Sequence, residues 1–418
     1  MMNRLARHML YRTRQRPHTA PTGLLAGIYP YQVPPTLPVG GPYMGRDLLS
    51  GNPAHLSPFV LYARGYITSP NVLVAGMVGM GKSAWTKTLV LRSLICNPKA
   101  KTWVIDPKGE YASLAQKVED GVVIKFGPDT DTQINPLYGL SVTEQIDVCW
   151  TIITAVTHQV NPNHTPGLEA KLAVTHALKM LRDNQTTATL ALLTTTLRAS
   201  NNPDGTPAAD ALETLQYSTL RGITGTGTTA THTLTQKQIV VIDLSRVPDD
   251  DLPIVTVCVQ AWINSIIQNN AGQHRYLVLD ECWRMFSGNI AIARWLQKSW
   301  KLCRQHGTAC IAIIHRLTDL NAAGDEHSQA RTIAEGILSD SGIRIFYRQP
   351  PDTLAYTAEK LHLTDTQTTH LEHLPRGQAL WLIGNTPPTI VQHQISPPEE
   401  PLIDTDHAMR GGDTLLPL

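Results

Sequence analysis

The chain has 418 residues, enough to bury a large core and to form two or three domains. Its 35 basic residues almost balance 34 acidic ones, so no overall field indicates a nucleic-acid or membrane partner. Six cysteines without a C-x-x-C pair exclude a disulfide framework or a zinc site, and indicate a reducing compartment such as the cytoplasm.

The N-terminal region is first basic and then rich in proline. Five arginines fall within residues 1–16, which suits either an unfolded basic tail or a basic helix in peripheral contact with the inner face of the cell membrane. Nine prolines follow in residues 17–58, and this composition predicts an extended arm, residues 1–58 in all. No apolar run is long and apolar enough to predict a membrane-spanning helix.

A phosphate-binding loop is predicted at residues 76–83, where the sequence GMVGMGKS fits G-x-x-x-x-G-K-[ST]. The apolar run 72–75 precedes it and a helical pattern follows, which is the strand–loop–helix context that the motif requires. Backbone N–H groups of such a loop cradle phosphates. The predicted nucleotide-binding residues are Gly76, Gly79, Met80, Gly81, Lys82, Ser83 and Ala84, with Lys82 on the β/γ-phosphates and Ser83 on Mg²⁺.

Strands and helices then alternate, which predicts an α/β fold with a mainly parallel sheet covered by helices on both faces. Predicted strands lie at 102–106, 122–126, 238–243, 276–281, 308–314, 343–347, 378–383 and 389–395. Between them, helical patterns with few strand signals predict an inserted helical subdomain. The expected boundaries are a first core part at 59–140, the insertion at 141–236, a second core part at 237–395, and a disordered tail at 396–418.

An acid pair ends the strand at 276–281. Asp280 is expected to hold the hydration shell of Mg²⁺, and Glu281 to polarise the attacking water. A base placed for water favours hydrolysis over phosphoryl transfer to a small acceptor, which disfavours a P-loop kinase. The pair predicts an ATPase with ATP and Mg²⁺ as its ligands.

Three further stretches combine with these motifs: DPKGEY at 106–111, INPL at 134–137 and DLS at 243–245. Together they resemble the HerA/FtsK superfamily of ring-forming P-loop motors, and most closely the conjugation and type IV secretion ATPases of the TraC/VirB kind. The resemblance implies a RecA-like core, a hexamer with ATP at subunit interfaces, and an arginine finger from the neighbouring subunit. It also implies that hydrolysis moves DNA or protein, or drives assembly of the secretion machine.

The resemblance also assigns residues. His315 follows the strand at 309–314, where family members often have Gln, and is the candidate γ-phosphate sensor. Arg344 and Arg348 are the candidate arginine fingers, with Arg331 as a weaker alternative. Family members usually carry a sizeable domain before the motor, whereas about 60 residues precede it here. A basic helical stripe (Arg294, Lys298, Lys301, Arg304) suits either a solvated face or sequence-independent contact with DNA.

Three functions stay open at this point. The first is a secretion or conjugation ATPase working with other components of that machine. The second is a DNA-translocating motor, either a coupling protein or a HerA-like helicase partner. The third is a nucleotide-gated assembly scaffold with little turnover.

Overall fold

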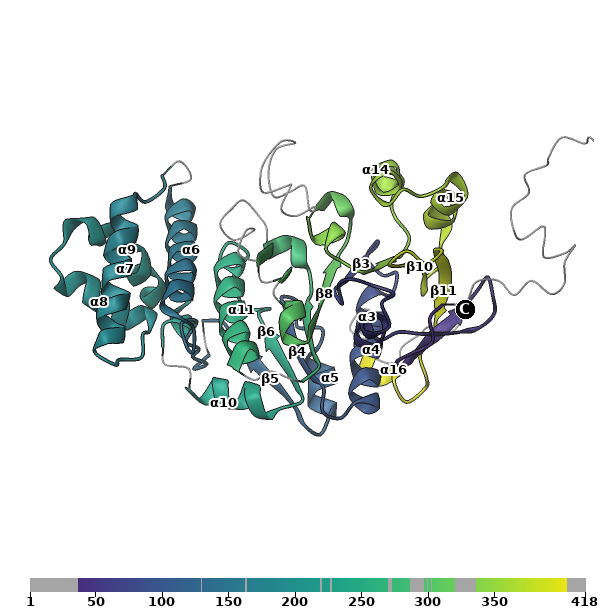
Figure 1. Cartoon of the computed structure of the whole chain (residues 1–418), viewed down its shortest axis with the longest axis horizontal. Helices are drawn as coiled ribbons and strands as arrows, with labels where there is room; N and C mark the ends of the chain where they lie inside the picture. Colours follow the sequence, from purple (N-terminus) through teal and green to yellow (C-terminus); the bar gives the residue numbers. More distant parts are fainter. Residues whose placement is uncertain are drawn as a thin grey trace, which may run out of the picture. The chain divides into compact units, whose positions relative to one another are not determined.

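The computed structural model describes residues 37–403, except 129, 162–163, 219, 226–227, 270–272, 286–296, 299, 302 and 320–335. These residues fold around a sheet of eleven strands in the order β2-β1-β11-β10-β9-β3-β8-β7-β4-β6-β5 (Figure 1). The basic segment 1–16, the tail 404–418, Arg294 and Arg331 lie outside the described residues.

Seven neighbouring strands run parallel. They are β9 (Ile343–Phe346), β3 (Val72–Ala75), β8 (Thr308–Ile314), β7 (Arg275–Leu279), β4 (Lys101–Asp106), β6 (Ile239–Asp243) and β5 (Gly121–Lys125). Every residue of β3, β6, β7 and β8 is buried, which explains why apolar residues dominate their sequences. Since parallel strands end at one edge, the loops after β3, β4, β7 and β8 meet there.

Four antiparallel strands extend the sheet beyond β9: β10 (Gln378–Ile383), β11 (Thr389–His393), β1 (Tyr43–Asp47) and β2 (Pro53–His55). Residues 43–55 thus form strands where the proline content predicted an extended arm. Pro53 is compatible with this because it begins the edge strand β2, where a missing N–H removes no ladder bond. Met44 on β1 is fully buried, which anchors this segment to the sheet.

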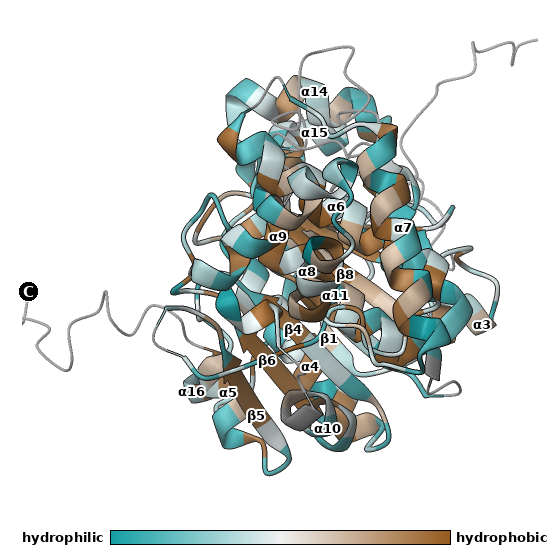
Figure 2. Cartoon of the chain, turned by 90° about the vertical axis from the view of Figure 1, so that its left-hand side faces the viewer, coloured by the Kyte–Doolittle hydropathy of each residue, from teal (hydrophilic) through white to brown (hydrophobic). Residues whose placement is uncertain are grey.

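Two apolar cores cover the two faces of the sheet, because alternate residues of each strand point to opposite sides. Val72 and Val74 belong to the core shared with α3 (Pro58–Ala63), α4 (Lys82–Cys96) and α5 (Ala112–Lys117). Leu73 and Ala75 belong to the core shared with α11 (Leu252–Asn269) and α14 (Pro351–Leu361). Figure 2 shows the apolar residues concentrated on the central strands, between helices of mixed polarity.

Between β5 and β6 the described residues form helices joined by turns and loops, with no strand among them. This insertion contains α6 (Val142–Val160), α7 (Leu168–Asp183), α8 (Leu190–Ala199), η1 (Pro203–Gly205), α9 (Thr206–Tyr217), η2 (Arg221–Ile223) and α10 (Thr228–Gln236). A capping box of Ser141 and Glu144 begins α6, and Gln268 of α11 donates to Glu144 at 3.1 Å. The predicted fold class, a mainly parallel sheet with an inserted helical subdomain, is therefore confirmed.

The remaining short elements are η3 (Cys282–Met285), η4 (Cys303–His306), α15 (Asp365–His373) and α16 (Glu400–Ile403). The last of these corrects the expectation of disorder from residue 396 onward. Glu399 forms an ion pair with Arg92 of α4 at 2.5 Å, which holds the segment against α4. In the part of the chain described, no helix is long and apolar enough to cross a membrane.

Candidate nucleotide-binding site

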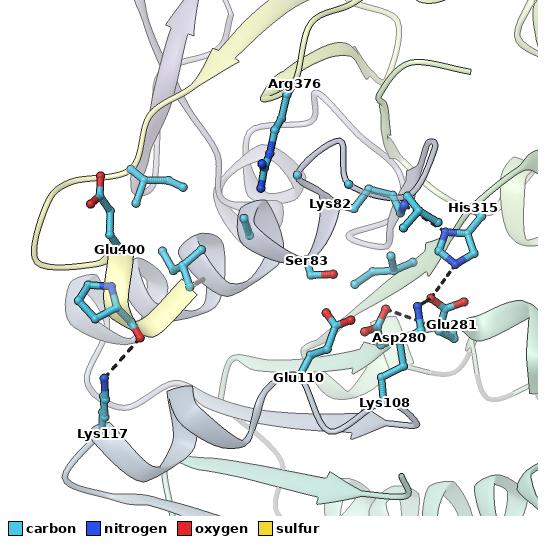
Figure 3. A pocket seen from close by; sticks show the side chains of 18 residues that line it. Lys82, Ser83, Lys108, Glu110, Lys117, Asp280, Glu281, His315, Arg376 and Glu400 are labelled. Atoms are coloured by element: carbon cyan, nitrogen blue, oxygen red, sulfur yellow. Dashed lines mark hydrogen bonds and ion pairs between the residues drawn. The ribbon is translucent and has the colours of Figure 1, made fainter. Parts of the chain in front are cut away.

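A cavity of about 660 Å³ opens where the loops after β3, β4, β7 and β8 meet (Figure 3). Eight of the predicted site residues line it: Gly79, Gly81, Lys82, Ser83, Ala84, Asp280, Glu281 and His315. Four others do not line it, namely Gly76, Met80, Arg344 and Arg348. The fold thus brings the predicted phosphate loop and acid pair together, although about 200 residues separate them in the chain.

The loop between β3 and α4 is held in shape by its glycines and by its neighbouring strands. Gly76 has φ +154°, and a Cβ there would lie 2.4 Å from Cβ of Tyr347. The N–H groups of Gly76 and Met77 donate to the carbonyls of His315 and Arg348, at 3.1 and 3.0 Å. Gly81 adopts a left-handed conformation and caps α4, so the helix begins at Lys82 and its free N–H groups face the cavity.

Lys82 is buried at the base of this loop. Its Nζ donates to the carbonyls of Gly76 (2.6 Å) and Met77 (3.0 Å), and contacts Nδ1 of His315 at 3.2 Å. Burial lowers the pKa of Lys82 to about 8, against the opposing effect of Glu281 and Asp280. The ammonium group is therefore already positioned, and the negative charge of a bound phosphate would stabilise the positive charge that burial disfavours.

Asp280 and Glu281 follow β7 directly but differ in their electrostatics. Burial, and then the neighbouring carboxylates of Glu281, Asp106 and Glu110, raise the pKa of Asp280 to about 8. Burial also raises the pKa of Glu281, but hydrogen bonds from His315 and Lys108 outweigh it and lower this pKa to about 2. Glu281 therefore carries a full negative charge at neutral pH, whereas Asp280 is poised to gain or lose a proton.

Glu281 has an unusual backbone, with φ +48°, a region that few non-glycine residues occupy. This conformation turns the chain sharply after Asp280 and leads into η3. The Glu281 side chain is only 4% exposed, and its Oε1 lies 2.8 Å from Nε2 of His315. Nδ1 of the same imidazole contacts Lys82, so His315 connects the phosphate loop to the acid pair.

The donor set fits Mg²⁺, which prefers oxygen ligands and retains several waters. Oδ2 of Asp280 is buried without a hydrogen-bond partner among the described residues, while Oδ1 accepts from the Glu281 N–H at 3.0 Å. An orphaned carboxylate oxygen beside a phosphate loop is what a cation or its waters would satisfy. Ser83 lines the same cavity and supplies the hydroxyl.

The cavity is also lined by residues that belong to no nucleotide-binding motif. Lys108 and Glu110 come from the DPKGEY loop, which had served only to indicate the family. Arg376 precedes β10, and Gly377 beside it donates its N–H to Met80 at 3.0 Å, so this loop rests on the phosphate loop. Pro401 and Ile403 of α16 form another wall. No sequence motif surrounds Arg376, Pro401 or Ile403.

The candidate arginine fingers lie on β9 and just after it. Both side chains are partly buried, and their Nε atoms have no hydrogen-bond partner within the described part of the chain. A terminal nitrogen of Arg348 donates to the carbonyl of His373 at 3.4 Å. In the basic stripe, Lys298 pairs with Asp147 at 3.0 Å and Lys301 with Asp340 at 3.7 Å. Among the described members of these two sets, none lines the cavity of its own chain.

Residues 57–260 match the family model described as "Helicase HerA, central domain". A search of curated proteins gave no match. Among solved structures, VirB4 of Thermoanaerobacter pseudethanolicus matches with a TM-score of 0.70 at 19% identity, over 86% of this chain and 98% of that one. The bacterial conjugative coupling protein TrwBΔN70 matches with a TM-score of 0.54 at 14% identity, over 78% and 85% of the two chains.

The plasmid coupling protein TrwB in complex with ADP and Mg²⁺ matches with a TM-score of 0.54 at 12% identity, over 78% of this chain and 86% of that one. At such identities the structural matches show a shared fold. The family match adds the phosphate-loop half of the core, and the cavity adds the acid pair opposite it. The chain is therefore a P-loop ATPase with the fold of VirB4 and TrwB, and its residues 57–260 are similar to the central domain of the helicase HerA.

Proposed function

We propose that this chain is the Mg²⁺-dependent ATPase subunit of a ring, hexameric in its working state, that powers conjugative DNA transfer or type IV secretion. The observation that carries the proposal is the position of Glu281. Its ionised carboxylate lies at the phosphate-loop cavity, directly after Asp280 and bonded to His315. A scaffold that only binds nucleotide has no need for such a group.

The residues divide the work of hydrolysis as follows. Lys82 and the N–H groups at the start of α4 bind the phosphates and neutralise their charge. Ser83 and Asp280 hold Mg²⁺, which when bound supplies positive charge at the phosphate oxygens. Glu281 orients the attacking water and accepts its proton. His315 contacts both Lys82 and Glu281. A γ-phosphate that binds Lys82 can therefore change the position of Glu281 through this imidazole.

The ring is supported by the position of the two candidate arginine fingers. Arg344 and Arg348 do not line it, so an arginine finger from either of them would act on a neighbouring subunit. Arg331, outside the described residues, is the weaker alternative. Mixing Lys82→Ala chains with Arg344→Ala or Arg348→Ala chains should restore activity at mixed interfaces. If neither mixture regains turnover, the finger lies elsewhere.

The relatives support the role of the motor. The printed descriptions of TrwB name a conjugative coupling protein, and VirB4 shares the fold over most of this chain. Partners of the ring are then other components of the transfer machine, and DNA contacted without sequence preference. We further propose that the protein works in the cytoplasm, with the basic segment 1–16 in peripheral contact with the inner face of the membrane.

The decisive experiment compares Glu281→Gln with Lys82→Ala. Glu281→Gln should abolish turnover while ATP still binds, whereas Lys82→Ala should lose ATP binding. Near-normal hydrolysis by Glu281→Gln would remove the basis of the proposal.

Adding single- or double-stranded DNA to the unaltered chain then separates the motor types. Strong stimulation of hydrolysis favours a DNA translocase, and none favours a secretion or assembly motor.

A further inference from the structure

Lys108 forms an ion pair with Glu281, the proposed general base. Its Nζ contacts Oε1 of Glu281, the same oxygen that lies 2.8 Å from His315. Figure 3 shows Glu281 between these two side chains. Lys108 is 36% exposed at its side chain and Glu281 only 4%. The lysine therefore reaches from the cavity wall to a nearly buried carboxylate.

The loop that carries Lys108 has a fixed shape. Oδ1 of Asp106 accepts from the N–H groups of Lys108 (3.1 Å) and Gly109 (2.8 Å), and its Oδ2 accepts from that of Tyr111 (2.8 Å). Asp106 is fully buried at the end of β4, and Gly109 has φ +75° beside the side chain of Ser245. One carboxylate thus organises three N–H groups, which distinguishes Lys108 from a lysine on a mobile surface loop.

Glu281 needs such a partner because a buried carboxylate is costly unless it is paired. The ammonium of Lys82 can only donate, so Nδ1 of His315 accepts from it and the Nε2–H of the same ring is directed at Glu281. In that arrangement the imidazole donates one hydrogen bond to the carboxylate, and the ammonium of Lys108 adds a second contact and a positive charge. Together the two contacts fix the direction of a side chain whose backbone already has φ +48°.

We propose that Lys108 is a positioning residue for hydrolysis: its ammonium group holds the Glu281 carboxylate in the orientation from which Glu281 directs the attacking water. This inference rests on the proposed role of Glu281. It assigns a function to the DPKGEY loop, whose sequence had served only to indicate the family. Lys108 acts through Glu281, so its loss changes the chemical step more than the binding of ATP.

The test measures kcat and KM for ATP in Lys108→Ala and Lys108→Arg. Lys108→Ala should lower kcat about 10- to 100-fold, the loss that a misplaced group typically causes, with KM changed less than about twofold. Lys108→Arg should recover most of kcat, because a guanidinium also pairs with a carboxylate.

Lys237→Ala is the matched control, since Lys237 is 38% exposed at its side chain and pairs with Asp120 far from the cavity. It should leave both constants unchanged. Thermal unfolding of each variant identifies any loss of fold, and Lys108→Gln, which keeps most of the side chain but removes its charge, replaces the Ala variant if that one unfolds.

A double-mutant cycle separates this role from a direct contact with phosphate. In the Glu281→Gln background, adding Lys108→Ala should change neither the residual turnover nor the Kd for ATP. An unchanged kcat in Lys108→Ala alone would overturn the proposal, and so would a weakened Kd in the double variant. Normal ATP hydrolysis by Glu281→Gln would overturn the proposed function itself. That result can be told apart from the two outcomes that would overturn only the role of Lys108.

Discussion

The parallel and antiparallel parts of the sheet contribute to the same cavity in different ways. The ends of the parallel strands β3, β4, β7 and β8 deliver Lys82, the DPKGEY loop, the acid pair and His315, because these ends converge on one edge. The antiparallel strands β1, β2, β10 and β11 deliver no acid of the site. They support the loop that bears Arg376 and hold it on the phosphate loop through Gly377.

This difference indicates that separate parts of the chain supply the catalytic groups and the walls that support the cavity. Substitutions at the ends of parallel strands should abolish turnover and leave the fold intact. Substitutions in the antiparallel part, and in the α16 segment that packs beside it on α4, should lower stability and leave the chemistry intact. The following predictions test that separation, beginning with the largest expected effect.

Asp280→Asn should lower turnover about 10³-fold, because it removes the carboxylate assigned to the metal side of the site. It should also stabilise the fold. The pKa of Asp280 is about 8 in the folded chain, above its ordinary value of 3.8. The folded state therefore binds this proton more tightly, and stability is lost as pH rises from about 4 to about 8.

The Asn variant escapes that loss, so its melting temperature should exceed that of the unaltered chain at about pH 8 and equal it near about pH 4. Melting curves and ATPase rates across this range check both effects. An Asn variant less stable than the unaltered chain at about pH 8 would show that Asp280 supports the fold instead of straining it.

Two glycines form a matched pair across the two parts of the sheet. Gly76 and Gly45 have φ +154° and +155°, and a Cβ at Gly45 would lie 2.0 Å from the carbonyl oxygen of Gln392. Gly76→Ala should weaken nucleotide binding about 10- to 100-fold, the equivalent of about 1–3 kcal/mol of strain in the phosphate loop. Gly45→Ala should instead lower the free energy of unfolding by about 1–3 kcal/mol.

Nucleotide titration and denaturant unfolding of both variants give the comparison. The separation of roles breaks down if Gly45→Ala changes the Kd for ATP as much as Gly76→Ala does.

Glu399→Gln should have the smallest effect. The carboxylate forms a bidentate contact with Arg92, at 2.7 and 2.5 Å, and accepts from Ser396. Burial raises the pKa of Glu399, but Arg92 and Ser396 outweigh it and lower this pKa to about 2. The folded pKa lies below the ordinary value of 4.5, so the stabilisation is present above about pH 4.5 and is lost as pH falls toward 2.

Near neutral pH the variant should lose about 1–2 kcal/mol of unfolding free energy, and kcat should stay unchanged. The difference from the unaltered chain should shrink as the pH falls. A stability difference that persists at about pH 2 would mean that the ion pair is not its source.

The parallel strands and the phosphate loop could be predicted because their signals are local. Fully buried strands such as β3 and β8 are uninterrupted apolar runs, and their predicted and observed limits coincide. The phosphate loop and the acid pair are short motifs with fixed spacing. Their meeting at one cavity follows from the rule that ligands bind at the carboxyl edge of a parallel sheet.

The rest could not be predicted because it depends on partners that are distant in the chain. β1 has an irregular sequence, and its place in the sheet is set by β11, nearly 350 residues later. The contact of Lys108 with Glu281 joins two loops that no local pattern connects. The roles of Arg344, Arg348 and His315 stay predictions, since they concern a neighbouring subunit or a bound nucleotide.

The position of β3 also affects how the protein is made. β3 lies between β8 and β9, and its last residue, Ala75, pairs with Ile314 and Phe346. A ribosome adding about 5 to 20 residues per second needs roughly 15 to 50 seconds to travel from Ala75 to Phe346. Until β8 has been synthesised, which takes up most of that time, this apolar strand has neither of its final neighbours. The nascent chain therefore depends on protection from aggregation, and its nucleotide loop is completed among the last parts of the core.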